Sequence, residues 1–199
     1  TPLPPHQVIG NYKRSKYLAE KIALKKATVG IPVVVVNPTA PVGPWDVKPT
    51  PTGKVILDFL KAKMPAYVKT GLNFVDVSDV VEGHILAATK GVIGERYILG
   101  NQNMSLLELF QNLEELSGKK RPSLHIPNWL AMGVGQIDDL IENKLLGREP
   151  KIPLEGIKMA QRPMYVNSQK AVEELGFPQS PVNEALYHAI QWFRDKGYY

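Results

Sequence analysis

Cysteine is absent from this 199-residue sequence, which excludes disulfide bonds, thiolate metal sites and a cysteine nucleophile. Long apolar runs are absent as well: the longest spans residues 31–36, against the ~18 residues that a membrane-spanning helix needs. The first residues carry neither the basic head nor the apolar stretch of a signal peptide. The four histidines are dispersed without the spacing of metal ligands. We therefore expect a cytoplasmic protein with no membrane association and no metal site.

Charge is only slightly unbalanced, with 24 basic against 19 acidic residues and a formal net charge of +5. One cluster of basic residues lies at residues 13–26, where a helical pattern makes a solvated face the simplest interpretation. Aromatic side chains do not alternate regularly with these basic residues, as they would in a nucleic-acid binder. The sequence therefore favours a small-molecule partner and no nucleic acid.

The first hundred residues alternate between helical and extended patterns, which is typical of an α/β protein. An apolar stripe predicts a helix over residues 6–28. The β-branched run that follows, residues 31–37, suits a strand buried on both faces, as in the middle of a parallel sheet. Beyond a proline-rich loop at 38–53, the pattern predicts a helix at 54–63, a strand at 66–69, a helix from Asp76 or Ser78 to Gly91 and a strand at 96–99.

The second half of the chain is mainly helical in pattern. Ser105 and Glu108 form a capping box ahead of an apolar stripe that ends at Gly118. Further helices are predicted at residues 128–147, 168–175 and 181–197. Helix capping is the simplest role for Asp76 and Asp79, and apolar packing is the simplest role for Trp129, Trp192 and Phe193.

The spacing that carries chemistry is Tyr12 and Lys16 in the first helix. Side chains four residues apart emerge on one helical face, within reach of each other. An ammonium beside a phenol favours the phenolate, which makes a tyrosine usable as a proton donor and acceptor. Such a pair is weak evidence alone, because a lysine-rich helix with a tyrosine readily contains one. The next strand, however, runs into the proline-rich loop, and open α/β sheets bind ligands at that carboxyl edge.

This arrangement resembles the extended short-chain dehydrogenases/reductases. Tyr-x-x-x-Lys is followed by a valine-rich strand and by Asn37-Pro-x-x-x-x-Gly-Pro, and later segments match in order: Asn73-Phe-Val-Asp-Val-Ser-Asp-Val, Glu95-Arg-Tyr-Ile-Leu-Gly and Lys170-Ala-Val-Glu-Glu-Leu-Gly-Phe. Within that superfamily the chain is most similar to the dihydroflavonol 4-reductase-like branch. It is especially similar to bacterial hopanoid-associated sugar epimerases, through residues 37–53 and Met64-Pro-Ala-Tyr67. The resemblance covers essentially the whole chain.

The resemblance implies the C-terminal part of a Rossmann-type parallel sheet, with a smaller, mainly helical substrate-binding region. Residues 1–37 and 73–100 would belong to the domain that binds NAD or NADP. Residues 38–72 and 101–199 would form the substrate-binding region. Members of this family commonly pair through the tyrosine-bearing helix, so a homodimer is expected.

Site residues follow from the resemblance by position. Tyr12 would be the general acid/base, and Lys16 would hold the nicotinamide ribose and tune Tyr12. The residues expected against the nicotinamide, partly through backbone atoms, are Pro38, Thr39 and Ala40. Asn37 matches a position that touches the sugar nucleotide in the epimerases, although capping the strand end is an equal alternative. Arg162 matches a diphosphate-binding arginine.

One departure from the family pattern concerns the cofactor. The family's glycine-rich turn, its ribose-binding acid and its catalytic serine or threonine all precede the tyrosine helix, so we expect the N-terminal dinucleotide-binding half to be absent from this chain. Ser15 cannot replace the missing hydroxyl, because it points about 60–100° away from the Tyr12 edge. Gly43 and Gly53 do not open a helix within a G-x-G-x-x-G frame. The 199 residues alone are therefore expected to be inactive, and to associate with the missing half or with a second copy.

The implied function is an NAD(P)-dependent oxidoreductase or epimerase that acts on a hydroxyl/ketone pair, with a nucleotide sugar as the first substrate candidate. A dihydroflavonol 4-reductase-like ketone reductase is the alternative within the enzyme class. From a different class, a non-catalytic Rossmann remnant could bind a nucleotide or a protein partner. The sequence leaves NAD versus NADP open, together with the direction of the reaction.

Overall fold

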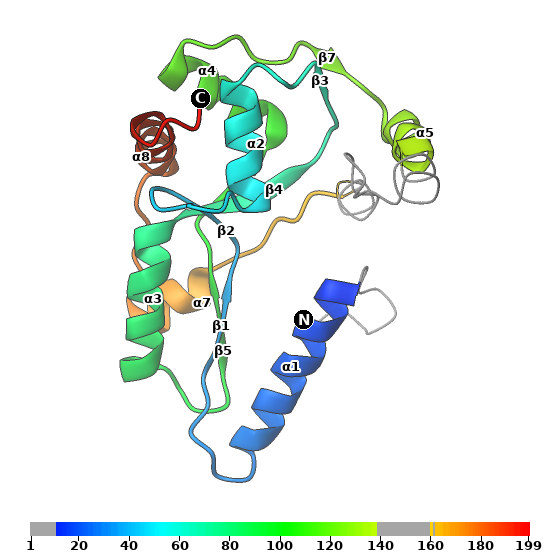
Figure 1. Ribbon diagram of the computed structural model, residues 1–199. Helices are drawn as coiled ribbons and strands as arrows, with labels where there is room; N and C mark the ends of the chain where they lie inside the picture. The colour runs from blue at the N-terminus through cyan, green and yellow to red at the C-terminus, as the bar shows by residue number, and fades with distance from the viewer. Residues whose placement is uncertain (1–10, 139–159, 161) are drawn as a thin grey trace.

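The computed structural model describes residues 11–138, 160 and 162–199, and it confirms the α/β fold (Figure 1). Two groups of elements make up the molecule, a lower one around a parallel strand pair and an upper one around a mixed sheet. The elements are α1 (Asn11–Ala27), β1 (Val35–Pro38), β2 (Ala40–Val42), α2 (Pro51–Leu60), β3 (Ala66–Tyr67), β4 (Gly71–Asp76), α3 (Val77–Lys90), β5 (Arg96–Leu99), β6 (Gln102–Ser105), α4 (Leu106–Ser117), β7 (Leu124–His125), α5 (Asn128–Asp138), α7 (Gln169–Leu175) and α8 (Val182–Asp195).

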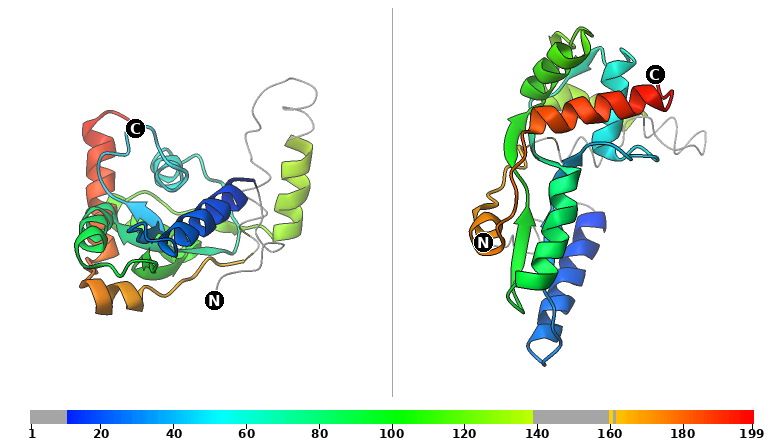
Figure 2. Two further views of the ribbon diagram at one scale, coloured as in Figure 1. Left: turned by 90° about the horizontal axis from the view of Figure 1, so that it is seen from below. Right: turned by 90° about the vertical axis from the view of Figure 1, so that its left-hand side faces the viewer.

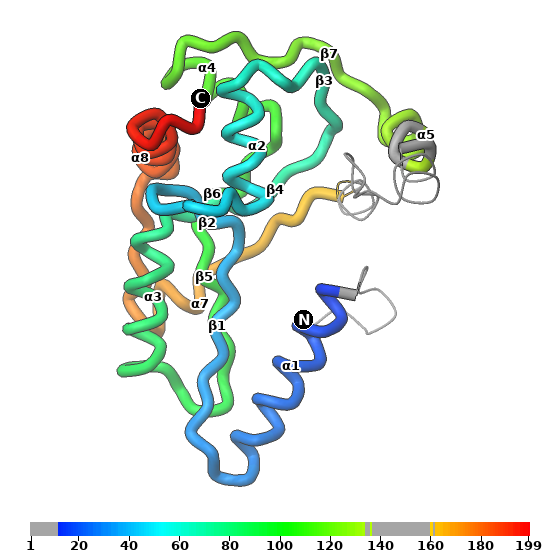
Figure 3. The backbone as a smooth tube through the Cα atoms, in the orientation of Figure 1, coloured from blue at the N-terminus to red at the C-terminus, as the bar shows by residue number. Residues whose placement is uncertain are grey.

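The lower group is built on β1 and β5, which pair in parallel with Val36 opposite Tyr97. Helices α1 and α3 lie on either side of this pair, and the tube in Figure 3 shows α1 slanting away from β1. The prediction that the first strand is buried on both faces was wrong, because Val35, Val36 and Asn37 are only half-buried. Among the described strands β1 pairs with β5 alone, so its other edge has no strand beside it there.

The upper group is built on a three-stranded sheet of order β2–β4–β6, in which β2 and β4 are parallel and β4 and β6 antiparallel. Helices α2, α4 and α8 enclose its core, as the right-hand view of Figure 2 shows. The sequence analysis missed all three strands, since it predicted a loop over residues 38–53, where β2 lies, and no strand at β4 or β6. The central β4 is almost wholly buried, and its polar Asn73 is satisfied by distant partners: its amide nitrogen donates to Asn103 at 2.8 Å, and its oxygen accepts from the Asn101 backbone N–H at 2.9 Å.

Helix ends follow the local capping signals. The Ser105–Glu108 capping box is present, and Gly118 and Gly176 adopt the left-handed conformation (φ 70° and 73°) that ends α4 and α7. Asp76 caps α3 as predicted, by accepting from the Ser78 backbone N–H at 2.7 Å. Helix α2 begins three residues before its predicted start, at Pro51, because Thr50 caps it. The predicted continuation of the α5 helix to residue 147 lies outside the described residues.

Buried residues form two clusters, one in each group of elements. The upper cluster includes Phe193 and Trp192, as predicted, whereas Trp129 is 74% exposed and contributes to neither cluster. The lower cluster joins α3 and β5 to α7 through Ala171 and Leu175. Helix α7 therefore packs on α3 and β5, which were predicted for the dinucleotide-binding domain, although its own residues lie within the range predicted for the substrate-binding region.

Asp79 links the two groups. Its carboxylate is buried and accepts from both the backbone N–H and the hydroxyl of Ser180, each at 2.7 Å. It thus anchors the segment before α8, rather than capping its own helix as predicted. In the described parts of the chain, no helix is long and apolar enough to cross a membrane.

Candidate functional site

Tyr12 and Lys16 lie on one edge of α1, as the helical spacing predicts. The Lys16 ammonium is 5.8 Å from the centroid of the Tyr12 ring, and the Tyr12 side chain is 69% exposed. Ser15 is occupied elsewhere, since its hydroxyl donates to the Tyr12 backbone carbonyl at 2.8 Å. The phenol and the ammonium are therefore side by side and accessible to a ligand.

Glu20 continues this edge by one more turn and joins the helix to the sheet. Its carboxylate accepts from the Asn37 side-chain amide at 3.1 Å and pairs with the Arg96 guanidinium at 2.8 Å. It thus connects α1 to Asn37 near the carboxyl end of β1 and to Arg96 at the amino end of β5. The sequence analysis missed Glu20, although its position four residues after Lys16 already placed it on the same face.

Asn37 lies at the end of β1, where it faces the helix. It lines an open cavity of about 490 Å³ between α1 and β1, together with Lys16, Tyr17, Glu20 and the apolar side chains of Ala19, Ala23, Val35 and Val36. The amide contact with Glu20 gives Asn37 a structural role, and its half-buried position leaves it beside the cavity.

The three residues after Asn37 cross from one sheet to the other. Pro38 ends β1 and is exposed, while the Thr39 backbone N–H donates to the Leu99 carbonyl at 3.1 Å. Ala40 begins β2 and is buried in the upper cluster. Any contact that Ala40 makes with a ligand is thus limited to its backbone.

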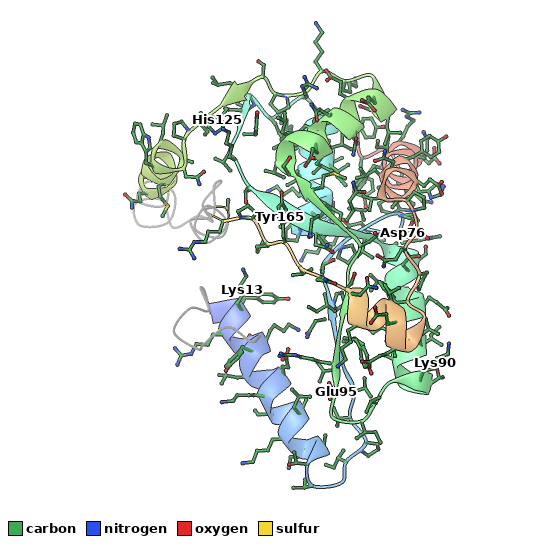
Figure 4. The ribbon with its side chains drawn as sticks, turned by 180° about the vertical axis from the view of Figure 1, so that it is seen from behind. Lys13, Asp76, Lys90, Glu95, His125 and Tyr165 are labelled. Atoms are coloured by element: carbon green, nitrogen blue, oxygen red, sulfur yellow. The ribbon has the colours of Figure 1, made fainter. Side chains whose placement is uncertain are left out.

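Arg162 lies on the segment that crosses above the N-terminal end of α1. Its side chain is exposed, and its carbonyl accepts from the Thr70 hydroxyl at 3.5 Å. Two residues later, the Met164 sulfur accepts from the Lys13 ammonium at 3.2 Å. Figure 4 shows this proximity, with Tyr165 on the crossing segment above Lys13. The structure therefore brings the segment that holds Arg162 to the helical turn that holds Tyr12.

Two further tyrosine–lysine pairs show that proximity alone does not define the site. The Lys21 ammonium is 6.0 Å from the Tyr17 ring centroid, and that of Lys170 is 4.8 Å from the Tyr97 centroid. Tyr97 is structural: burial raises the pKa of its phenol, which donates to Glu174 at 2.8 Å. Tyr17 lies ~7.5 Å farther along α1 than Tyr12, away from the carboxyl end of β1. Position along α1 therefore favours Tyr12.

Replacing Glu20 tests whether it positions the helix. We expect Glu20→Ala to lower the free energy of unfolding by about 1 kcal/mol, because Asn37 and Arg96 lose their shared acceptor in a partly exposed setting. That corresponds to a fall of about 2–4 °C in the midpoint of thermal unfolding. Calorimetry of the variant beside Glu82→Ala, an exposed helical glutamate, measures the difference. Equal midpoints for the two variants would show that the contact contributes nothing.

Comparison with known proteins identifies the family. Residues 1–100 match the model of the NAD dependent epimerase/dehydratase family, which is half of the chain. The chain belongs to this family. This result confirms the resemblance to extended short-chain dehydrogenases/reductases and the Rossmann-type fold class. The family is NAD-dependent, and the matched residues include Tyr12 and Lys16.

Individual relatives agree with the family. The chain is 46% identical over 199 residues to a dihydroflavonol 4-reductase-like protein of Synechocystis sp., covering 98% of this chain and 58% of that protein. It is 35% identical over 188 residues to sterol demethylase protein B of Methylococcus capsulatus, covering 94% and 57%. A nucleoside-diphosphate-sugar epimerase from Pseudomonas aeruginosa superposes with a TM-score of 0.81 at 29% identity, covering 98% and 59%. The chain thus spans less than two thirds of the length of these relatives.

Proposed function

We propose that this chain supplies the residues that transfer the proton in an NAD(P)-dependent oxidoreductase or epimerase that acts on a hydroxyl/ketone pair. The observation that carries the proposal is the exposed Tyr12–Lys16 edge of α1, which Glu20 joins to Asn37 near the carboxyl end of β1. Open α/β sheets bind ligands at that end. Membership of an NAD-dependent family supports the redox chemistry.

In this scheme, proton transfer by Tyr12 accompanies hydride transfer. When the dinucleotide is bound, it supplies a hydride to the carbonyl carbon or removes one from the alcohol carbon. The Tyr12 hydroxyl gives its proton to the carbonyl oxygen as the alcohol forms, and the phenolate takes the proton back in the oxidation. The Lys16 ammonium, 5.8 Å from the centroid of the Tyr12 ring, would donate hydrogen bonds to the ribose hydroxyls.

The residues of this chain fit the nicotinamide end of a dinucleotide. Lys16 and Asn37 provide hydrogen-bond donors at the mouth of the cavity between α1 and β1. Pro38 and Thr39 would face the nicotinamide ring from the end of β1. The pyrophosphate end requires a glycine-rich loop, and the G-x-G-x-x-G pattern does not occur in the 199 residues. We therefore propose that the region the relatives have in addition covers this cavity and completes the cofactor site, within a homodimer.

The names of the relatives indicate different substrates. The Pseudomonas protein is named for nucleoside-diphosphate sugars, which corresponds to the nucleotide sugar expected from the resemblance, with Arg162 at the diphosphate. The Synechocystis and Methylococcus proteins are more similar to this chain and are named for a dihydroflavonol and a sterol. Reduction or oxidation of a ring ketone or ring alcohol is therefore the second candidate.

Titration with NADH tests the proposal that the cofactor site is divided between this chain and the additional region of the relatives. We define the extended protein as these 199 residues joined to the region of the Synechocystis relative that lies outside the matched 58% of its length. The 199 residues alone should bind NADH more weakly than millimolar, because only the nicotinamide end has partners, whereas the extended protein should bind at micromolar concentration. Fluorescence of the bound dinucleotide reports both. Micromolar binding by the 199 residues alone would contradict this division.

A further inference from the structure

A second cavity, of about 230 Å³, lies in the upper group between α2, β4, α4 and the segment that carries Met164. Its walls are apolar, formed mainly by Val55, Leu72, Phe74, Leu106, Leu109 and Met164. Among the described residues that line it, none is charged, and the only side-chain polar groups are the hydroxyls of Thr52 and Thr70. The Thr70 hydroxyl is directed to the Arg162 carbonyl.

The wall at Met164 connects this cavity to the tyrosine. The Met164 backbone N–H donates to the Gly71 carbonyl at 2.9 Å, and Met164 lies beside Leu72 in a parallel bridge. On its other side, the Met164 sulfur accepts from the ammonium of Lys13, the residue next to Tyr12. One side chain therefore contacts both the cavity and the turn of α1 that holds Tyr12.

The apolar walls of this cavity determine which kind of ligand it can bind. A diphosphate or a sugar placed against such a surface would lose its hydration without gaining hydrogen bonds, whereas a hydrocarbon surface gains free energy from the same burial. The volume is below the 300–1,000 Å³ that encloses a drug-sized ligand, so the cavity accepts the body of a substrate and leaves its reactive end outside. The exposed Arg162 side chain does not line the cavity.

We infer that the substrate is an alcohol or ketone carried on an apolar ring or isoprenoid body, and that this body occupies the Leu72–Met164 cavity. The inference rests on the proposed function for the reacting hydroxyl or carbonyl group. It selects the second substrate candidate above and opposes a nucleotide sugar.

Ligand binding to the 199-residue chain tests the inference without requiring turnover. The probes are 2-decalone, a bicyclic ketone, and UDP-glucose, both measured by isothermal titration calorimetry. Decalone should bind with a negative heat-capacity change, the signature of buried apolar surface, and UDP-glucose should not bind at millimolar concentration. Leu72→Arg should weaken decalone binding at least tenfold. Leu124→Arg, at an exposed position in β7, should leave it unchanged.

Several outcomes would overturn the inference. These are UDP-glucose binding as tightly as decalone, no decalone binding at millimolar concentration, or equal decalone affinity in Leu72→Arg and the unsubstituted chain. If circular dichroism shows that Leu72→Arg does not fold, Leu72→Asn places a polar group of similar size at the same wall and is judged by the same criterion. Failure of the proposed function is distinguishable, because Tyr12→Phe would then retain turnover while the decalone result stands.

Discussion

Tyr12→Phe should lower kcat of the extended protein by about 10²–10⁴-fold, the range that a positioned general acid or base contributes. KM for the substrate and the affinity for NADH should change little, because the phenyl ring keeps its place on the exposed edge of α1 and only the hydroxyl is lost. Steady-state kinetics followed through NAD(P)H absorbance, together with NADH titration, separate the two effects.

Tyr17→Phe is the matched control for this variant. Tyr17 has its own lysine four residues later at almost the same ring distance, 6.0 Å against 5.8 Å for Tyr12, and it stands on the same helix. Tyr17 lines the cavity between α1 and β1, but the Phe substitution keeps the aromatic ring and removes only the hydroxyl, so kcat should equal that of the unsubstituted protein. If Tyr17→Phe lost turnover and Tyr12→Phe kept it, the assignment of the general acid/base would move to Tyr17.

Lys16→Met should lower kcat/KM of the extended protein roughly 10- to 100-fold, corresponding to the loss of a charge-assisted hydrogen bond to the ribose. Affinity for NADH should fall as well, which distinguishes this variant from Tyr12→Phe. Steady-state rate measurements and NADH titration test both consequences.

Lys21→Met provides the corresponding control, since Lys21 is exposed and belongs to the Tyr17 pair. It removes one positive charge from the same helix and should leave both NADH affinity and kcat/KM unchanged. A loss of equal size in the two lysine variants would point to the overall charge of α1, rather than to the position of Lys16.

Local signals in the sequence predicted the helices well. The capping box of Ser105 and Glu108 and the left-handed Gly118 concern hydrogen bonds between residues at most a few positions apart, so the sequence contains both partners. The same reasoning placed Tyr12 and Lys16 on one edge, since side chains four apart share a face of any α-helix. For these features the tertiary structure added distances and left the assignments unchanged.

Strands were harder to predict where their partners are distant. The β4 strand contains Asn73 and ends at Asp76, polar residues that argue against a buried strand until Asn101 and Asn103 are known to satisfy Asn73. The burial of β1 was overestimated because the sequence does not show how many strands lie beside it. A valine-rich run shows that a strand can be buried, but the number of neighbouring strands decides how far it is.

The sequence by itself determined the capped ends of α3, α4 and α7, the α/β class and the tyrosine–lysine edge, because these depend on backbone geometry and on neighbours along the chain. Only the tertiary structure showed that Glu20 holds Asn37 and Arg96 together, and that Met164 joins an apolar cavity to the turn of Tyr12. Those contacts join residues 17 to 151 positions apart. Their pairing depends on how helices and strands pack, which no local pattern encodes.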